Sequence, residues 1–398
     1  MTADPGPLFA FALAAISLIG PLAVHLFMPV IPAVRAALGL SASLAQLTFS
    51  IALLGMAVST LFYGSLSDRY GRRPVLLSGL ALFLVGSALS AVATSVVPLV
   101  LGRLVQAIGA GCGLTLGRVI AKDVYGADRL VKAIAYLTMA YTIGPMISPM
   151  VGGILIDAFG WRSVFFFALG FGAVIAACAY FVVFETRPPA PGNRGGGSVL
   201  RDYAEMFGHM RFTAYVLQSG LMSATFLTAA SAASSLLKDT LHRPSTEFGI
   251  YFLLFPFGYL TGNFITSRIG TRIANETMVL AGSLLLVITV AVQSSVLLAG
   301  YLTPLTLFVP GFFLTLSQGL SLSYAQAGAM ATNPRLSGTA AGIGVFMQNF
   351  CGAAFVQLYG LLADGTAIPL TETTAITALC AISAGLVPFL MARQARQA

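Results

Sequence analysis

Charged residues are scarce in this chain of 398 residues. Only 9% of the residues are Asp, Glu, Lys or Arg, whereas 57% are hydrophobic. A soluble domain needs far more charge to cover its surface, so the composition excludes an array of soluble domains. A run of about 20 apolar residues can cross the bilayer core as a helix, and the chain contains many such runs. The composition therefore indicates a polytopic membrane protein.

Residues that carry enzyme or metal chemistry are also few. The four cysteines form no CxxC pair, which excludes a disulfide framework or a metal site. The three histidines form no HExxH pair, and no GxSxG elbow is present. The three lysines lie outside any GxxxxGK phosphate loop, so no nucleotide-driven machinery is visible. We therefore expect no metal, no cofactor and no enzymatic activity.

The apolar runs predict twelve membrane spans. Several exceed 20 residues, so tilt or kinks are expected. The predicted spans are residues 8–34, 44–65, 74–95, 98–121, 131–156, 163–184, 211–236, 247–267, 276–296, 301–330, 338–362 and 371–392.

The placement of the net charge of +8 predicts the topology. With the N-terminus inside, fifteen basic residues fall on the inner side and four on the outer side. This bias follows the positive-inside rule and predicts both termini in the cytoplasm, with the chain in a bacterial inner membrane. The basic balance thus reports topology, and a nucleic-acid partner is not expected.

One break in composition divides the spans into six and six. Residues 185–211 read ETRPPAPGNRGGGSVLRDYAEMFGHMR, where proline, glycine and charge concentrate as in a linker. We predict an all-α membrane protein with a six-helix bundle over 1–184, a cytoplasmic linker over 185–210 and a second six-helix bundle over 211–398.

The two halves also resemble each other. The loop after the second span reads GSLSDRYGRR (64–73), and the loop after the eighth reads NFITSRIGTR (263–272). Three positions match in an ungapped alignment, and Asp68 is replaced by Ser267 in the second copy. These matches indicate an internal duplication, which predicts two pseudo-symmetric bundles with a substrate site between them near the bilayer midplane.

The first of these loops, GSLSDRYGRR, has a mechanical interpretation. Gly64 lets two helix ends approach closely, and Gly71 permits a tight turn. Asp68 can accept hydrogen bonds from helix N-terminal amides and pair with an arginine of the loop or of a neighbouring helix. The loop can thus latch one conformation closed, although a simpler interpretation is a basic loop that only sets topology.

This loop resembles the signature loop of the major facilitator superfamily, G-x-L-x-D-R-x-G-R-R/K. The matching residues are Gly64, Leu66, Asp68, Arg69, Gly71, Arg72 and Arg73. The resemblance covers the whole chain, because twelve spans with a linker after the sixth is the plan of that superfamily. It implies a secondary transporter.

The fourth span resembles that of the bicyclomycin-resistance type of drug:proton antiporter. The matching residues of RLVQAIGAGCGLTLGRVIAKDVYG (103–126) are Arg103, Gln106, Gly109, Arg118 and Asp123. An arginine inside a span is costly and usually faces a cavity or a partner, although Arg103 could also extend to the outer interface. We expect Arg118 and Asp123 to anchor the inner helix end.

The fifth span contains YTIGPMISPMVGG (141–153), which resembles the antiporter-associated motif. The matching residues are Gly144, Pro145, Pro149, Gly152 and Gly153. Prolines bend a helix because they remove backbone donors. The resemblance implies export by antiport, and ordinary helix packing is the alternative.

His25 is the main departure from the resembled exporters. Their first span commonly carries an aspartate just before M/L-x-x-P, whereas this chain reads VHLFMP, and no Asp or Glu lies deep in any predicted span. Imidazole titrates near physiological pH, so His25 is a candidate for proton exchange, for substrate binding, or for a structural hydrogen bond. Without a fixed negative charge, and with Arg103 present, we expect a neutral or anionic substrate.

Polar and aromatic residues of other spans can line a mostly apolar cavity, or can join helices by hydrogen bonds. These candidates are Tyr136, Tyr141, Gln218, Ser219, Tyr251, Tyr259, Gln318, Tyr324, Gln348 and Asn349.

The sequence thus predicts a monomeric secondary transporter that exports an amphipathic small molecule, with protons as coupling ions and the lipid bilayer as its surroundings. The alternative is proton-coupled uptake of an anionic metabolite or siderophore-like compound, with Arg103 and His25 engaging its carboxylate.

Overall fold

A computed structural model of the chain describes residues 6–186 and 197–397, and its regular secondary structure over these ranges is helical. Twelve helical stretches are long and apolar enough to cross a membrane. This confirms the predicted all-α fold class with twelve spans. Of the predicted linker over 185–210, residues 187–196 lie outside the described residues.

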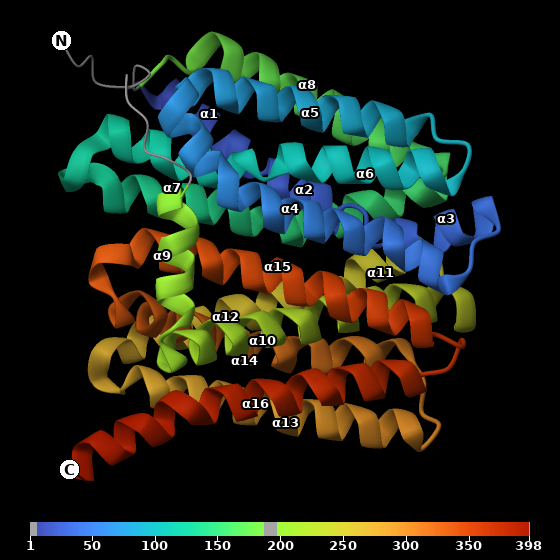
Figure 1. Ribbon diagram of the computed structural model, residues 1–398. Helices are drawn as coiled ribbons and strands as arrows, with labels where there is room; N and C mark the ends of the chain where they lie inside the picture. Colours follow the sequence, from blue (N-terminus) through green and yellow to red (C-terminus); the bar gives the residue numbers. More distant parts are fainter. Residues whose placement is uncertain (1–5, 187–196, 398) are drawn as a thin grey trace. The chain divides into compact units, whose positions relative to one another are not determined.

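Figure 1 shows the course of the helices. In chain order they are α1 (Pro7–Ser17), α2 (Ile19–His25), α3 (Val30–Leu38), α4 (Ala42–Tyr70), α5 (Arg72–Ala91), α6 (Val96–Ala110), α7 (Cys112–Phe159), α8 (Arg162–Val182), α9 (Gly197–Phe207), α10 (Met210–Ser235), α11 (Ser245–Phe252), α12 (Leu254–Ile269), α13 (Asn275–Leu298), α14 (Pro304–Thr332), α15 (Ser337–Leu362) and α16 (Ile368–Gln397), with a π-helical turn at Leu236–Thr240 and 3₁₀ turns at Gly270–Arg272 and Pro334–Leu336.

The chain forms two compact units. The first comprises Met1–Gly192 and Pro244–Gly249, and the second comprises Asn193–Arg243 and Ile250–Ala398. The short segment 244–249 therefore belongs to the first unit, although it lies in the second half of the sequence.

The first predicted span, 8–34, is divided into three helices in the first unit. Pro21, Pro29 and Pro32 lack the N–H that would bond the carbonyl four residues earlier, so the helical ladder cannot run unbroken. A tight turn over residues 26–29 separates α2 from α3, and the N–H of Met28 donates to the carbonyl of His25 at 3.3 Å. Proline spacing thus explains a break that the sequence predicted only as a kink.

Helices α5 and α6 lie side by side in the first unit, in closest contact where each carries glycine (Figure 1). A Cβ on Gly109 would meet the backbone N of Phe83, and a Cβ on Gly86 would meet the backbone N of Gln106. Small residues let two backbones approach in this way. Gly109 therefore packs directly against the backbone of α5.

Helix α7 corrects two predicted boundaries. It begins at Cys112, because Gly111 separates it from α6 within the predicted span 98–121, and it continues through residues 122–130, where a connection was expected. The segment KDVYGADRL contains no proline, so nothing in it blocks the backbone ladder. The two membrane-spanning stretches nevertheless stay separate, as Val96–Tyr125 and Tyr136–Phe159.

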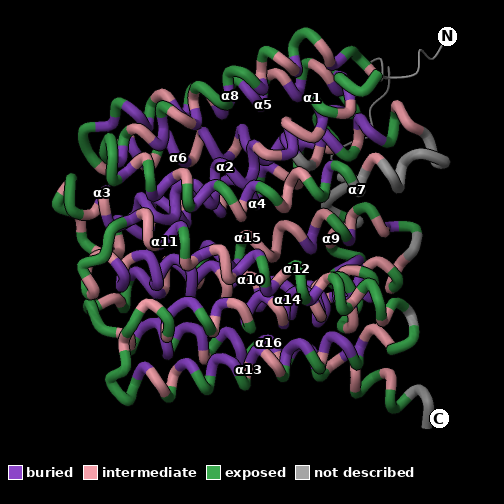
Figure 2. The backbone as a smooth tube through the Cα atoms, turned by 180° about the vertical axis from the view of Figure 1, so that it is seen from behind, coloured by how far each residue is buried: buried purple, intermediate pink, exposed green. Residues whose placement is uncertain are grey.

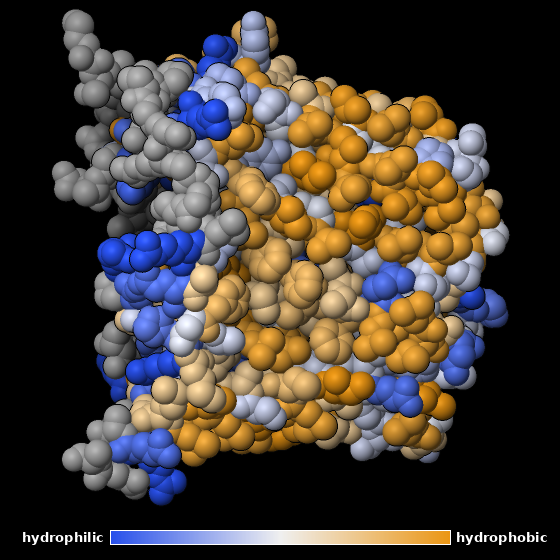
Figure 3. Space-filling view, in the orientation of Figure 1, coloured by the Kyte–Doolittle hydropathy of each residue, from blue (hydrophilic) through white to orange (hydrophobic). Residues whose placement is uncertain are grey.

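The second unit is built around α10, which packs against α14, α15 and α16. Of the membrane-spanning window in Met210–Thr240, 83% is buried, and α10 is mostly buried along its length (Figure 2). Figure 3 shows hydrophobic side chains over the middle of the visible helices and hydrophilic side chains toward their ends. This surface suits helices whose outer faces contact lipid.

We expect Gly109→Ala to lower the free energy of unfolding by about 1–3 kcal/mol, because its methyl group would force α5 and α6 apart. Thermal unfolding of the purified protein in detergent measures the change. Gly342→Ala is the matched control, since no described atom lies within 4 Å of a Cβ built there. Equal unfolding curves for the two variants would contradict the assigned contact.

Candidate functional site

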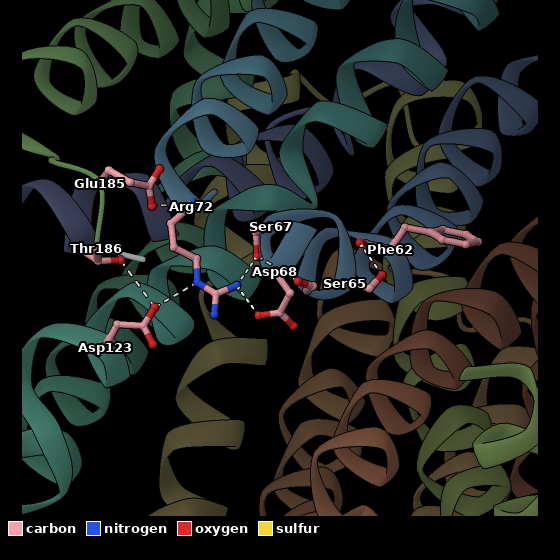
Figure 4. A network of polar contacts seen from close by, with 9 residues as sticks. Phe62, Ser65, Ser67, Asp68, Arg72, Asp123, Glu185 and Thr186 are labelled. Atoms are coloured by element: carbon pink, nitrogen blue, oxygen red, sulfur yellow. Dashed lines mark hydrogen bonds and ion pairs between the residues drawn. The ribbon is translucent and has the colours of Figure 1, made fainter. Parts of the chain in front are cut away.

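Arg72 organises a polar cluster at the start of α5 (Figure 4). Only 4% of its side chain is exposed, and its Nη1 lies 2.8 Å from Oδ1 of Asp68 while its Nε donates to Oδ2 of Asp123 at 2.9 Å. Its Nη1 also donates to Oγ of Ser67 at 2.7 Å. The guanidinium therefore joins Asp68 near the end of α4 to Asp123 of α7. The sequence predicted Asp68 as part of the latch and Asp123 as an anchor of its helix end.

Glu185 completes the cluster from the end of the α8 segment. Its Oε1 accepts the N–H of Arg72 at 2.9 Å, and its Oε2 accepts the N–H of Arg73 at 3.1 Å (Figure 4). These are the first amides of α5, which have no partner within the helix. A carboxylate at this end also interacts favourably with the helix dipole, so Glu185 caps α5 from 113 positions away.

Gly71 is required at this turn for two reasons. Its φ is +96°, a conformation that side chains disfavour, and a Cβ on it would lie 2.6 Å from Oε2 of Glu185. Gly71 therefore forms the predicted tight turn and also leaves room for the Glu185 carboxylate beside it.

The other residues of this loop make fewer polar contacts than Arg72. Arg73 donates from Nη2 to the carbonyl of Tyr180 at 2.8 Å, and its guanidinium stacks on the Tyr180 ring at 5.2 Å. Arg69 lies over the ring of Tyr70 at 5.1 Å. No described atom lies within 4 Å of a Cβ built on Gly64, so close approach of a helix end at Gly64 stays a prediction.

The duplicated loop in the second unit is held differently. Ser267, at the position of Asp68, donates its hydroxyl to the carbonyl of Phe264 of its own helix at 2.7 Å. The loop is fixed instead by the Tyr324 hydroxyl, which donates to the carbonyl of Gly270 at 2.6 Å. Arg335 is paired with Glu205 of α9 at 3.1 Å. With serine in place of the acid, no arginine-centred cluster like that of Arg72 forms at this loop among the described residues.

Arg103 is enclosed within the first unit, with 1% of the residue exposed. Its Nε donates to the carbonyl of Thr48 at 3.2 Å, and its Nη1 donates to Oε1 of Gln106 at 2.6 Å. Gln106 in turn donates from Nε2 to Oγ of Ser87 at 2.8 Å. The side chain therefore faces the interior of the unit, where the sequence had left extension to the outer interface as an alternative.

The aromatic ring of Phe27 lies 4.0 Å from the guanidinium carbon of Arg103. Phe27 stands in the turn between α2 and α3, two residues after His25. His25 itself is buried, and its imidazole hydrogen-bonds the backbone of Pro21. The break in the first span thus brings the turn that follows His25 into contact with Arg103 through Phe27.

The antiporter-type motif of α7 packs against this broken helix. A Cβ on Gly144 would meet the ring of Pro21, and a Cβ on Gly152 would meet the carbonyl of Leu26 at 2.6 Å. Gly153 faces another partner, the backbone of Ser245, whose N–H donates to Asp157 at 3.1 Å. The two inner prolines, Pro145 and Pro149, lie between these contacts. Within the first unit, the glycines of the motif therefore allow α7 to pack closely against the segment that carries His25 and Phe27.

The candidate cavity residues of the second unit form a polar core around Met222. Gln318 donates from Nε2 to the Met222 carbonyl at 2.7 Å, and Gln218 donates to Oγ of Ser283 at 3.0 Å. Buried and tied to neighbouring helices, these two residues act as links between helices in this conformation.

The remaining candidates differ in exposure and contacts. Ser219 donates to the carbonyl of Val216 at 2.9 Å, and Asn349 donates to the carbonyl of Val345 at 3.0 Å. Tyr251 stacks on Phe308 with centroids 5.5 Å apart. Tyr136 is 54% exposed, whereas Tyr141, Tyr259 and Gln348 are half-buried.

Carboxylates avoid the middle of the described spans. Each Asp or Glu inside a membrane-spanning helix lies within four positions of an end of that helix. Asp364 lies in the connection before α16, where the hydroxyl and N–H of Thr366 hold its pKa below the ordinary value. No cluster of three metal-ligating side chains occurs among the described residues.

Sequence reasoning missed Glu185, Ser67, Thr48 and Phe27 as contacts of the two arginines. Of these, Glu185 had a signal, because an acid directly after a long apolar run lies at the same membrane side as the loop that it caps. The other three carry no such signal.

We expect Glu185→Ala to accelerate amide hydrogen exchange in the first turn of α5 about 5- to 30-fold, since the loss of a cap costs about 1–2 kcal/mol. Exchange mass spectrometry of peptides covering 71–76 measures it. Glu372→Ala, which removes an exposed acid of α16, is the control. An unchanged rate in Glu185→Ala would contradict the cap.

The sequence profile of the Major Facilitator Superfamily matches residues 13–356, which is more than half of the chain. Among curated relatives, an uncharacterized MFS-type transporter, YdgK, of Bacillus subtilis (strain 168) is 27% identical, covering 93% of this chain and 92% of its own. Multidrug resistance protein D of Escherichia coli (strain K12) is 27% identical over 86% of each chain. Multidrug resistance protein MdtL of Escherichia coli O17:K52:H18 is 28% identical over 80% of this chain and 82% of its own.

Solved structures of transporters are similar in fold. The POT family transporter PepTSo gives a TM-score of 0.77 at 14% identity, covering 98% of this chain and 99% of its own. The xylose transporter XylE from E. coli gives 0.72 at 14% identity, covering 95% and 96%. At these identities the likeness concerns the fold alone.

Proposed function

The chain belongs to the Major Facilitator Superfamily and is a multi-pass membrane transporter of small molecules, and we propose that it exports a neutral or anionic amphipathic compound in exchange for protons. Export would proceed by alternating access across a bacterial inner membrane, with both termini in the cytoplasm. The charge bias of the loops supports this orientation.

The observation that carries the proposal is the charge of the buried interior. Arg103 is enclosed in the first unit, while the carboxylates of the described spans stay near helix ends. A buried positive charge repels a lipophilic cation and tolerates a neutral or anionic solute. Two relatives named multidrug resistance proteins support export as the direction.

The resemblance to the bicyclomycin-resistance type of antiporter adds to this proposal. Arg103, Gln106 and Gly109 carry it in α6, together with Arg118 and Asp123 in α7. His25 then stands in place of an acid as the group that exchanges protons.

Uptake of an anionic metabolite is the second candidate. It is favoured by the same observation, because a buried guanidinium with only uncharged protein partners among the described residues can bind a carboxylate. The two candidates differ in direction, which transport assays decide.

Everted membrane vesicles test the direction. We expect chloramphenicol, a neutral probe, or 2-naphthoate, an anionic one, to accumulate only when the vesicle lumen is acidic, and the accumulated probe to leave when a protonophore collapses the gradient. Vesicles without the protein are the control. Accumulation confined to right-side-out vesicles would refute export and favour uptake.

We expect His25→Ala to abolish transport or to remove its dependence on the pH gradient, because imidazole titrates near physiological pH and His25 is the only histidine that lies inside a predicted span. Transport at several imposed gradients measures this. His209→Ala, which changes an exposed histidine before α10, is the control. Transport by His25→Ala with the normal pH dependence would exclude His25 from coupling.

A further inference from the structure

We propose that Arg103 is the residue that binds the acid group of an organic anion, so that the transported compound is an amphipathic carboxylate. This inference rests on the proposed function in one respect, that the chain moves a small molecule, and is independent of the direction of transport and of its coupling to protons.

The first step is the enclosure of the Arg103 charge. The residue is 1% exposed, and each of its contacts within the described chain is uncharged: the Thr48 carbonyl, the Gln106 side-chain amide and the Phe27 ring. Its Nη2 is buried and has no hydrogen-bond partner within the described part of the chain. A buried charge is ordinarily compensated by an opposite charge or by hydrogen bonds to all its donors. Arg103 lacks this compensation in the described residues.

The second step is the contrast with Arg72. Arg72 is also buried, but it contacts two carboxylates, from Asp68 and Asp123. The same unit thus satisfies one buried guanidinium with acids and leaves the other without an acid. Two carboxylates neutralise Arg72, whereas the buried Nη2 of Arg103 has no acceptor among the described residues, which leaves this donor for a ligand from outside the chain.

The third step is the geometry that remains available. Thr48 occupies Nε and Gln106 occupies one N–H of Nη1, which leaves N–H groups on both terminal nitrogens. Two adjacent N–H groups in a plane match the two oxygens of a carboxylate. Gln106 is itself fixed by Ser87 at 2.8 Å, so the orientation of the guanidinium is preset.

The fourth step concerns the rest of the ligand. The ring of Phe27 covers the guanidinium at 4.0 Å, and Phe27 lies in the turn that the glycine face of α7 supports. An apolar wall beside a single cationic group suits a compound with one acid group and an aromatic or aliphatic body. Since Nη2 is enclosed in this conformation, binding requires that the surrounding helices part, as in alternating access.

Binding to the purified protein tests the inference without any gradient. The probes are 2-naphthoate, its uncharged analogue 2-naphthamide, and chloride. For the wild type we expect naphthoate to bind at least tenfold more tightly than naphthamide by isothermal calorimetry, and more tightly than chloride. Equal affinity for naphthoate and naphthamide, or binding of chloride alone, would overturn the inference even if no variant could be purified.

Variants locate the site. We expect Arg103→Gln to weaken naphthoate binding at least tenfold and to leave naphthamide binding within twofold, whereas Arg103→Lys keeps the charge and part of the affinity. Arg393→Gln, which removes an exposed arginine near the end of α16, is the control and should bind like the wild type. Naphthoate binding that is unchanged in a folded Arg103→Gln variant would refute the assignment.

The outcomes separate this inference from the proposed export. Tight, Arg103-dependent naphthoate binding in a protein that accumulates compounds only in right-side-out vesicles would refute export alone. Export of chloramphenicol by a protein that does not bind naphthoate would refute the carboxylate site alone.

Discussion

Hydrocarbon cannot hydrogen-bond, so every polar group in a membrane-spanning helix must find its partner inside the protein. The structure satisfies this constraint mainly by placing its acids near helix ends and by returning side-chain hydroxyls to their own helices. Few charges are left inside, and each has a visible consequence. Arg72 gathers two carboxylates, a serine and a capping acid into one cluster, whereas Arg103 has only uncharged neighbours among the described residues.

The two halves respond to this constraint in different ways. In the first unit an arginine at the start of α5 holds the turn through acids of α4 and α7. In the second unit a serine replaces the first acid, and a tyrosine hydroxyl holds the corresponding turn through the carbonyl of Gly270. Both turns thus have a glycine with positive φ at the matching position, Gly71 and Gly270, but the groups that hold the two turns differ.

Apolar runs were sufficient to predict the fold class and the number of spans, because the requirement for about 20 apolar residues per span is local. The pairing around Arg72 was also largely predictable, since Asp68 lies only four positions earlier, across the turn at Gly71. The contact of Glu185 with α5 spans 113 positions, and the depth of Arg103 depends on how the turn at residues 26–29 packs. Both the long-range contact of Glu185 and the burial of Arg103 follow from tertiary packing, which no local sequence pattern encodes. The helical continuity through residues 122–130 was missed because the spans were predicted from apolar runs, and a helix can continue beyond the end of such a run.

The position of Glu185 has a practical consequence for dividing the chain. This carboxylate fixes the start of α5, and the next residue, Thr186, donates to Asp123 at 3.4 Å. A break in the polypeptide designed to express the halves separately therefore belongs after Thr186. A cut two residues earlier would leave Glu185 in the second fragment. The first fragment would then have to fold with the first amides of α5 lacking their carboxylate acceptor.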